Sequence, residues 1–159
     1  MPVEIVPATP ADVAVILELI RALSEYEKLA HTVLATEDAL RHSLFGPRPA
    51  AEVLLALDDA RPVGFALFFP NYSTFLAKPG LYLEDLFVTP HARGRGIGGA
   101  LLKRLAVIAR ERGYGRVEWS VLDWNEPAIG FYKKLGAIPM DEWTTFRLTE
   151  EGIAKLATQ

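Results

Sequence analysis

The chain has 159 residues, 50% of them hydrophobic and 23% charged, which predicts a single domain over residues 1–159 with a substantial buried core. Its formal net charge of −3 lacks the basic excess of nucleic-acid-binding domains, and the absence of cysteine excludes disulfides, thiolate metal sites and thiol nucleophiles. No apolar run approaches the roughly 18 residues of a membrane span, and no secretory signal is evident. We therefore expect a soluble, cytoplasmic protein that binds neither nucleic acid nor membranes.

The N-terminal part predicts a strand and two helices. A short strand over residues 3–7 is followed by a helix whose start is marked by Thr9 as N-cap and by Asp12 three residues later. Apolar residues then recur at helical spacing, which indicates a core-facing stripe. A second helix is predicted from Thr36 to Gly46.

The middle of the chain predicts a hairpin and a further strand. Residues 51–57 and 62–69 have the composition of strands and are joined by a short polar turn. Residues 71–80 contain proline and glycine and indicate a loop, after which residues 81–88 form a strand.

The remaining pattern predicts alternating helices and strands. They are a helix over 99–113, a strand over 115–123, a helix from Asn125 to Gly136, strands over 137–140 and 144–149, and a short helix from Thr149. The order of elements indicates an α/β fold with a mixed, mostly antiparallel sheet flanked by helices.

A glycine-rich segment, residues 93–99, lies between the strand at 81–88 and the helix after it. Unpaired amides at a helix start favour an anion, and the missing Cβ atoms let a phosphate approach the backbone closely. Arg93 and Arg95 carry guanidinium groups that suit pyrophosphate oxygens. The segment therefore predicts a phosphate-binding loop.

Two other phosphate motifs fit this segment less well. Gly94, Gly96 and Gly99 match the dinucleotide pattern G-x-G-x-x-G, and Asp123 ends the next predicted strand. However, residues 89–93 separate the strand from the first glycine, and the chain is too short for a second nucleotide-binding half. A Walker A loop is excluded because no Gly-Lys-Ser/Thr follows. An NAD-binding oxidoreductase is the weaker alternative.

Two adjacent carboxylates, Glu84 and Asp85, interrupt the apolar strand at 81–88. Period-two alternation predicts that their side chains leave on opposite faces of the sheet. Apolar neighbours would desolvate a carboxylate here, raise its pKa and make it a better base. Because charges in such a strand are costly, the sequence favours a functional role over a surface salt bridge.

Tyr132 lies on the predicted helix that begins at Asn125. A phenol with an ordinary pKa of about 10 can donate a proton to a leaving group. The apolar periodicity around it favours a core aromatic instead. The residue pattern alone leaves both roles open.

Three stretches of the chain together resemble a known family. RGRGIGGALL is similar to the pyrophosphate motif Arg/Gln-x-x-Gly-x-Gly/Ala of the GCN5-related N-acetyltransferases (GNAT), with Arg93, Gly96 and Gly98 at its defining positions. YLEDLFV and WNEPAIGFYKKLGA extend the resemblance to the diamine (spermidine/spermine) and thialysine acetyltransferase subgroup, over nearly the whole chain. The resemblance implies the GNAT fold, an acetyl-CoA-dependent N-acetyltransferase and a homodimer.

The resemblance also implies roles for individual residues. Glu84 is implied as the general base and Tyr132 as the general acid of a direct acetyl transfer to an amine. The implied cofactor contacts are Phe87, Val88, Arg93, Gly94, Arg95, Gly96, Ile97, Gly98, Gly99, Asn125 and Tyr132.

The acceptor is expected to be the primary amine of a small molecule, bound by Glu27, Glu84 and Asp85 with Trp143 as a wall. Polyamine enzymes of the family carry further acidic residues after the first helix, which suits ligands with several positive charges. Here a cation, Lys28, and two apolar residues take part of that place. A thialysine-like or lysine-like amino acid is therefore at least as well supported as a polyamine.

The three histidines lack metal-ligand spacing, so no metal is predicted. A non-catalytic acyl-CoA sensor is a further alternative, and the presence of both Glu84 and Tyr132 argues against it.

Overall fold

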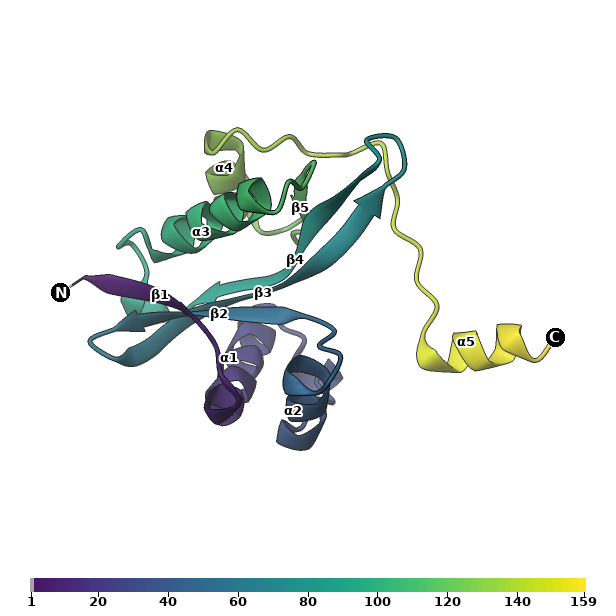
Figure 1. Cartoon of the computed structure of the whole chain (residues 1–159), viewed down its shortest axis with the longest axis horizontal. Helices are drawn as coiled ribbons and strands as arrows, with labels where there is room; N and C mark the ends of the chain where they lie inside the picture. The colour runs from purple at the N-terminus through teal and green to yellow at the C-terminus, as the bar shows by residue number, and fades with distance from the viewer. Residues whose placement is uncertain (1) are drawn as a thin grey trace. The chain divides into compact units, whose positions relative to one another are not determined.

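The computed structural model describes residues 2–159, which form two compact units, residues 2–120 and Val121–Gln159 (Figure 1). The first unit contains β1 (Val3–Pro7), α1 (Val13–Tyr26), α2 (Glu37–Phe45), β2 (Glu52–Asp58), β3 (Arg61–Ser73), β4 (Lys78–Val88), α3 (Ile97–Glu111) and β5 (Val117–Trp119). Short 3₁₀ turns lie at Pro10–Asp12, Ala30–Thr32 and Pro90–Ala92. The second unit contains α4 (Glu126–Lys134) and α5 (Glu150–Ala157).

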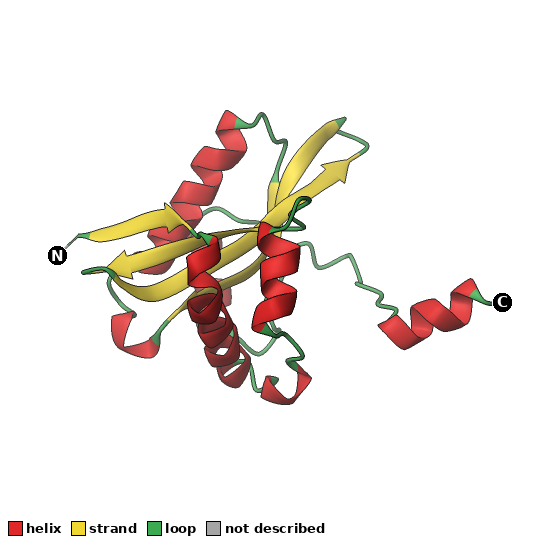
Figure 2. Ribbon diagram, turned by 60° about the horizontal axis from the view of Figure 1, so that its bottom comes forward, coloured by secondary structure: helices red, strands yellow, loops and turns green. Residues whose placement is uncertain are grey.

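The first unit is built on a five-stranded sheet in the order β1-β2-β3-β4-β5 (Figure 2). The first four strands pair antiparallel with their neighbours, whereas β4 and β5 are parallel. The parallel pair requires a crossover connection, and α3 provides it. The predicted mixed, mostly antiparallel sheet is therefore confirmed.

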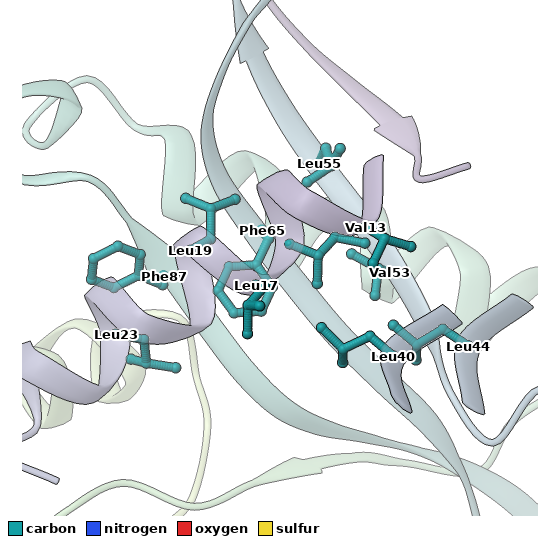
Figure 3. Close-up of a cluster of buried hydrophobic side chains, with 11 residues drawn as sticks. Val13, Leu17, Leu19, Leu23, Leu40, Leu44, Val53, Leu55, Phe65 and Phe87 are labelled. Atoms are coloured by element: carbon teal, nitrogen blue, oxygen red, sulfur yellow. The ribbon is translucent and has the colours of Figure 1, made fainter. Parts of the chain in front are cut away.

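Helices cover both faces of this sheet: α1 and α2 lie on one face and α3 on the other (Figure 1). The face beneath α1 and α2 holds a buried hydrophobic cluster to which α1, α2, β2, β3 and β4 all contribute (Figure 3). Phe65 and Phe87 are its aromatic members from the sheet. Packing of this kind fixes the end of α1 against β4, where the carboxylates lie.

The predicted helix boundaries rest on caps that the structure confirms. The backbone N–H of Thr9 donates to Asp12 Oδ2 at 2.7 Å, although Pro10–Asp12 forms a 3₁₀ turn and α1 begins only at Val13. Thr36 Oγ1 accepts from Ala39 N at 3.1 Å at the start of α2. The sequence signals for these helix starts were therefore correct to within a few residues.

One loop prediction and three strand predictions differ from the structure. The predicted loop at 71–80 is mostly strand, because β3 and β4 continue as a long hairpin to Ser73 and from Lys78. The strand predicted over 115–123 shrinks to Val117–Trp119. Residues 137–140 and 144–149 form no strand in the second unit. Their apolar pattern gives strand propensity, but a strand forms only where a partner supplies a hydrogen-bonded ladder.

A β-bulge interrupts β4 at the carboxylate pair. Leu83 pairs with Phe68, but Asp85 pairs with Leu67, so Glu84 is an extra residue on β4 at this point. Before the bulge the odd-numbered residues lie on the α3 face, and after it they lie on the α1 face, where Phe87 joins the buried cluster. The bulge thus brings Asp85 to the side of the sheet that α1 covers.

Candidate active site

The glycine-rich segment forms an open turn at the start of α3. Gly94 and Gly96 have φ values of 79° and 77°, a left-handed conformation that side chains with a Cβ adopt at a cost. Gly96 is the N-cap of α3 and has no side chain to cap it. A Cβ built on Gly94 or Gly96 meets no protein atom within 4 Å, so the space beside both is open. The turn therefore presents the first amides of α3 to an anion.

Both arginines of this loop already have partners within the protein. Arg95 Nη1 donates to Asp58 Oδ2 at 2.6 Å, and Arg95 Nη2 donates to Asp58 Oδ1 at 3.4 Å. Arg93 Nε donates to the carbonyl oxygen of Val88 at 2.9 Å. A phosphate would therefore meet the backbone amides of the loop first, and would have to compete with Asp58 for Arg95.

The strand that leads into this loop has an open side. β4 pairs with β5 only over Leu81–Leu83, although β4 itself runs on to Val88. In the described residues no strand pairs with Glu84–Val88 on that side. Nearby, the hydroxyl of Thr89 is buried and has no hydrogen-bond partner among the residues described. Because Thr89 N donates to Val63 O on β3, alternation directs the backbone groups of Phe87 to β3 and those of Val88 to the open side. Of the two expected contacts for an extended ligand arm, Val88 is therefore the one on this side, and its carbonyl oxygen accepts from Arg93 Nε.

Three carboxylates gather where the bulge meets the end of α1. Burial, together with the charges of Glu84 and Glu27, raises the pKa of Asp85 from 3.8 to about 6. Burial and the charge of Glu84 raise the pKa of Glu27. These mutual effects define an acidic cluster of Glu27, Glu84 and Asp85 that has an electrostatic reason to take up a cation.

The cluster corrects two expectations for the carboxylate pair. Glu84 and Asp85 do not leave the sheet on opposite sides, and both interact with Glu27 at the end of α1: besides burial, the charge of Glu84 raises the pKa of Glu27, and the charges of Glu84 and Glu27 raise the pKa of Asp85. The bulge is the reason, because an extra residue breaks the period-two alternation. Asp85, and not Glu84 as expected, is the carboxyl that burial desolvates, whereas Glu84 is exposed to solvent.

The other predicted site residues belong to the second unit. Asn125 is buried at the N-cap of α4, and its Oδ1 accepts from Ala128 N at 3.4 Å. Tyr132 lies on α4, half-buried, with its ring centroid 5.7 Å from that of Phe131. Trp143 is largely exposed, between α4 and α5.

Two residues of the site were not found by sequence reasoning. Tyr26, the last residue of α1, has the guanidinium carbon of Arg93 4.7 Å from its ring centroid. Asp58 ends β2 and pairs with Arg95 across 37 residues of sequence. The position of Tyr26 directly before Glu27 was a sequence signal for its role. The role of Asp58 depends on long-range packing, which no local pattern reports.

Within residues 2–159 no helix is long and apolar enough to cross a membrane. The same residues contain no group of three or more histidine or acidic side chains arranged to hold a metal ion.

Curated proteins of known activity are similar to the chain over most of its length. A thialysine N-epsilon-acetyltransferase from Bos taurus is 40% identical, with 94% of each chain covered. The L-ornithine N5-acetyltransferase NATA1 from Arabidopsis thaliana is 35% identical, over 92% of this chain and 84% of the relative. A spermidine/spermine N(1)-acetyltransferase-like protein from Homo sapiens is 32% identical over 94% of this chain, which corresponds to 23% of that protein.

Among solved structures, an integron cassette protein from the mobile metagenome of V. cholerae superposes with a TM-score of 0.84 at 29% identity. The superposition covers 100% of this chain and 99% of the other. The sequence model of the acetyltransferase (GNAT) family matches residues 17–137, a span that includes the glycine-rich loop and the acidic cluster. The chain therefore belongs to the GNAT family of acetyltransferases, which use acetyl-CoA, and is an N-acetyltransferase.

Proposed function

We propose that the protein transfers the acetyl group of acetyl-CoA to a side-chain amine of a small amino acid of the thialysine, lysine or ornithine kind. The observation that carries this proposal is the acidic cluster of Glu27, Glu84 and Asp85 beside the glycine-rich loop. The names of the similar proteins support the same acceptor class. The family match extends from α1 beyond α4, which supports one catalytic domain over residues 1–159.

The residues of the loop fit a pyrophosphate. The amides of Ile97, Gly98 and Gly99 are the first of α3 and have no acceptor one turn earlier in the helix. The side-chain-free positions Gly94 and Gly96 leave room for phosphate oxygens. Acetyl-CoA, when bound, supplies the activated acetyl group, and the open side of β4 at Val88 would hold its pantetheine arm.

The acceptor must lose a proton before it can attack, because an alkyl ammonium has a pKa of about 10.4. We assign this proton to Glu84, through a water molecule, since Glu84 is exposed and lies next to the ammonium-binding carboxylates. Asp85 and Glu27 would hold the ammonium before the transfer. Tyr132 is proposed to give a proton to the leaving thiolate, and Asn125 to contact the cofactor, both on the strength of the family motif.

The small acidic cluster favours an acceptor with one uncompensated ammonium group: the α-carboxylate of an amino acid balances its α-ammonium, whereas every charge of a polyamine is uncompensated. One cation beside Glu27 and Asp85 offsets the burial and the carboxylate repulsion that together raise the pKa of Asp85. Lys28 directly follows Glu27 and adds a positive charge at the end of α1, which disfavours a second cationic group there. We therefore place polyamines below thialysine, lysine and ornithine as substrates.

The test is release of CoA thiol from acetyl-CoA against thialysine, lysine, ornithine, putrescine, spermidine and spermine. The expected order of kcat/KM places the three amino acids above the polyamines. Glu84→Gln should lower kcat, whereas Asp85→Asn should mainly raise KM for the amine. Activity on none of these amines, with CoA still bound, would contradict the proposal and favour an acyl-CoA sensor.

A further inference from the structure

The side chain of Arg93 is held between the cofactor loop and the end of α1. Its guanidinium carbon lies 4.7 Å from the ring centroid of Tyr26 and 5.4 Å from that of Phe87. Its Nε donates to the carbonyl oxygen of Val88 at 2.9 Å. Three contacts from two elements therefore fix one side chain of the loop, and both rings offer their electron-rich faces to its charge.

The end of α1 is closed by two backbone hydrogen bonds. Leu29 N donates to the carbonyl oxygen of Ser24 at 2.8 Å, and Lys28 N donates to that of Glu25 at 3.1 Å, which is the hydrogen-bond pattern of a Schellman motif. Lys28 takes the left-handed position of this motif with a φ of 62°. Glu27, next to Tyr26, is therefore fixed in space once the ring of Tyr26 is fixed.

Through its contact with Tyr26, Arg93 thus influences the position of Glu27, the carboxylate that follows Tyr26. Arg93 opens the glycine-rich loop, Tyr26 ends α1, and Glu27 begins the acidic cluster. Phe87 anchors the stack because it is buried in the hydrophobic cluster under α1. By contrast, Gly94 and Gly96, which follow Arg93, contribute no side chain that could hold the loop.

We propose that Arg93 is a positioning residue for the acceptor amine: its stack on Tyr26 fixes Glu27 relative to the cofactor loop. The inference rests on the proposed function and adds a physical link between its two binding sites. A ligand that orders the loop then also orders the end of α1. Because such coupling is reciprocal, acetyl-CoA and the amine should tighten each other's binding by the same factor.

The proposed stack needs a planar cation and an aromatic ring, and three variants test these two requirements separately. Arg93→Lys keeps the charge but loses the planar guanidinium. Tyr26→Leu removes the ring, whereas Tyr26→Phe retains it. We expect Arg93→Lys and Tyr26→Leu each to raise KM for the amine by about fivefold to tenfold. For Tyr26→Leu, which leaves every residue of the cofactor loop in place, kcat and the Kd of CoA measured without amine should change less than about twofold.

Tyr26→Phe should behave as the wild type, which a requirement for the hydroxyl group would not allow. The double variant Arg93→Lys/Tyr26→Leu should be no worse than either single variant, because both changes remove the same contact. Tyr114→Leu is the matched control, since it breaks the other arginine–tyrosine contact, in which the Arg112 guanidinium lies 6.0 Å from the Tyr114 ring. This control should leave KM for the amine unchanged.

The measurements are steady-state kinetics with the best amine of the panel and calorimetric titration of CoA in its absence and presence. In the wild type the amine should lower the Kd of CoA, and in Arg93→Lys this effect should largely disappear. An active wild type whose two single variants have additive effects, or an Arg93→Lys variant that loses only CoA affinity, would overturn the inference alone. An inactive wild type would overturn the proposed function instead.

Discussion

Arg95 and Asp58 join the cofactor loop to the end of β2 through two hydrogen bonds of 2.6 and 3.4 Å. The guanidinium of Arg95 lowers the pKa of the Asp58 carboxyl, so the pair is charged at neutral pH. Asp58 thus binds the guanidinium of Arg95, which a phosphate of the cofactor would otherwise attract. The Asp58 carboxylate and a cofactor phosphate would therefore compete for Arg95.

The variant Asp58→Asn should bind CoA more tightly, by about twofold to fivefold at low salt, because it releases Arg95 for the phosphates. The gain should shrink as ionic strength rises. Titration calorimetry at two salt concentrations measures both effects. Glu52→Gln is the matched control, since it breaks the similar Arg112 pair at the end of α3. Weaker CoA binding by Asp58→Asn would mean that the pair holds the loop in its binding conformation.

Asp85 should make the protein less stable as the pH rises. Its pKa is about 6 in the native state and 3.8 as an ordinary aspartate, so the unfolded chain loses this proton first. The free energy of unfolding therefore falls between these two pKa values, and the loss is complete above the higher one. Asp85→Asn should remove this fall and raise stability at pH 8 by on the order of 2 kcal/mol.

Urea denaturation at a series of pH values measures this effect. Asp58→Asn provides a contrast, because Arg95 lowers the pKa of Asp58 and loss of that carboxylate should destabilise the protein at neutral pH. Parallel stability curves for the wild type and Asp85→Asn would show that Asp85 is not desolvated in solution.

Tyr132→Phe tests the proposed acid directly. If the phenol gives its proton to the thiolate, kcat should fall by a factor of about 10² to 10⁴ while the Kd of CoA stays nearly constant. Phe131→Leu, a change at the exposed neighbour on α4, should leave kcat close to that of the wild type. An unchanged kcat in Tyr132→Phe would return this residue to the role of a packing aromatic.

The turn between β2 and β3 offers a stabilising substitution. Asp59 and Ala60 have φ values of 51° and 65°, as a two-residue hairpin turn of type I′ requires. Ala60→Gly relieves the strain of a side chain in this conformation and should stabilise the protein by about 1 kcal/mol. The same replacement at Ala106, exposed in the middle of α3, should destabilise it by about 1 kcal/mol. Thermal unfolding of both variants should thus show shifts of opposite sign.

Local patterns predicted the helices well because their signals are local. Thr36, Asn125 and Thr149 each cap the helix predicted to follow, and Gly113 has the positive φ expected after α3. The glycine-rich loop was also foreseen, since its conformation depends on glycines that the sequence displays.

The sheet and the acidic cluster were predicted less well because they depend on pairing between distant residues. Pro79 and Gly80 suggested a loop, yet both positions lie in the paired hairpin of β3 and β4. The bulge at Glu84 arises from the register between β4 and β3, which alternation within β4 cannot reveal. The pairing of Arg95 with Asp58 likewise depends on packing between distant parts of the fold.

The bulge has a meaning for anyone who moves this chemistry to another scaffold. Because Glu84 is a residue in excess, the strand is read in one frame up to Leu83 and in the other from Asp85 onward. Copying a Glu-Asp pair into a regular strand would send the aspartate to the wrong layer, whatever its neighbours. The β-bulge itself must therefore be transferred with the two residues, because it determines the face of the sheet on which their side chains lie.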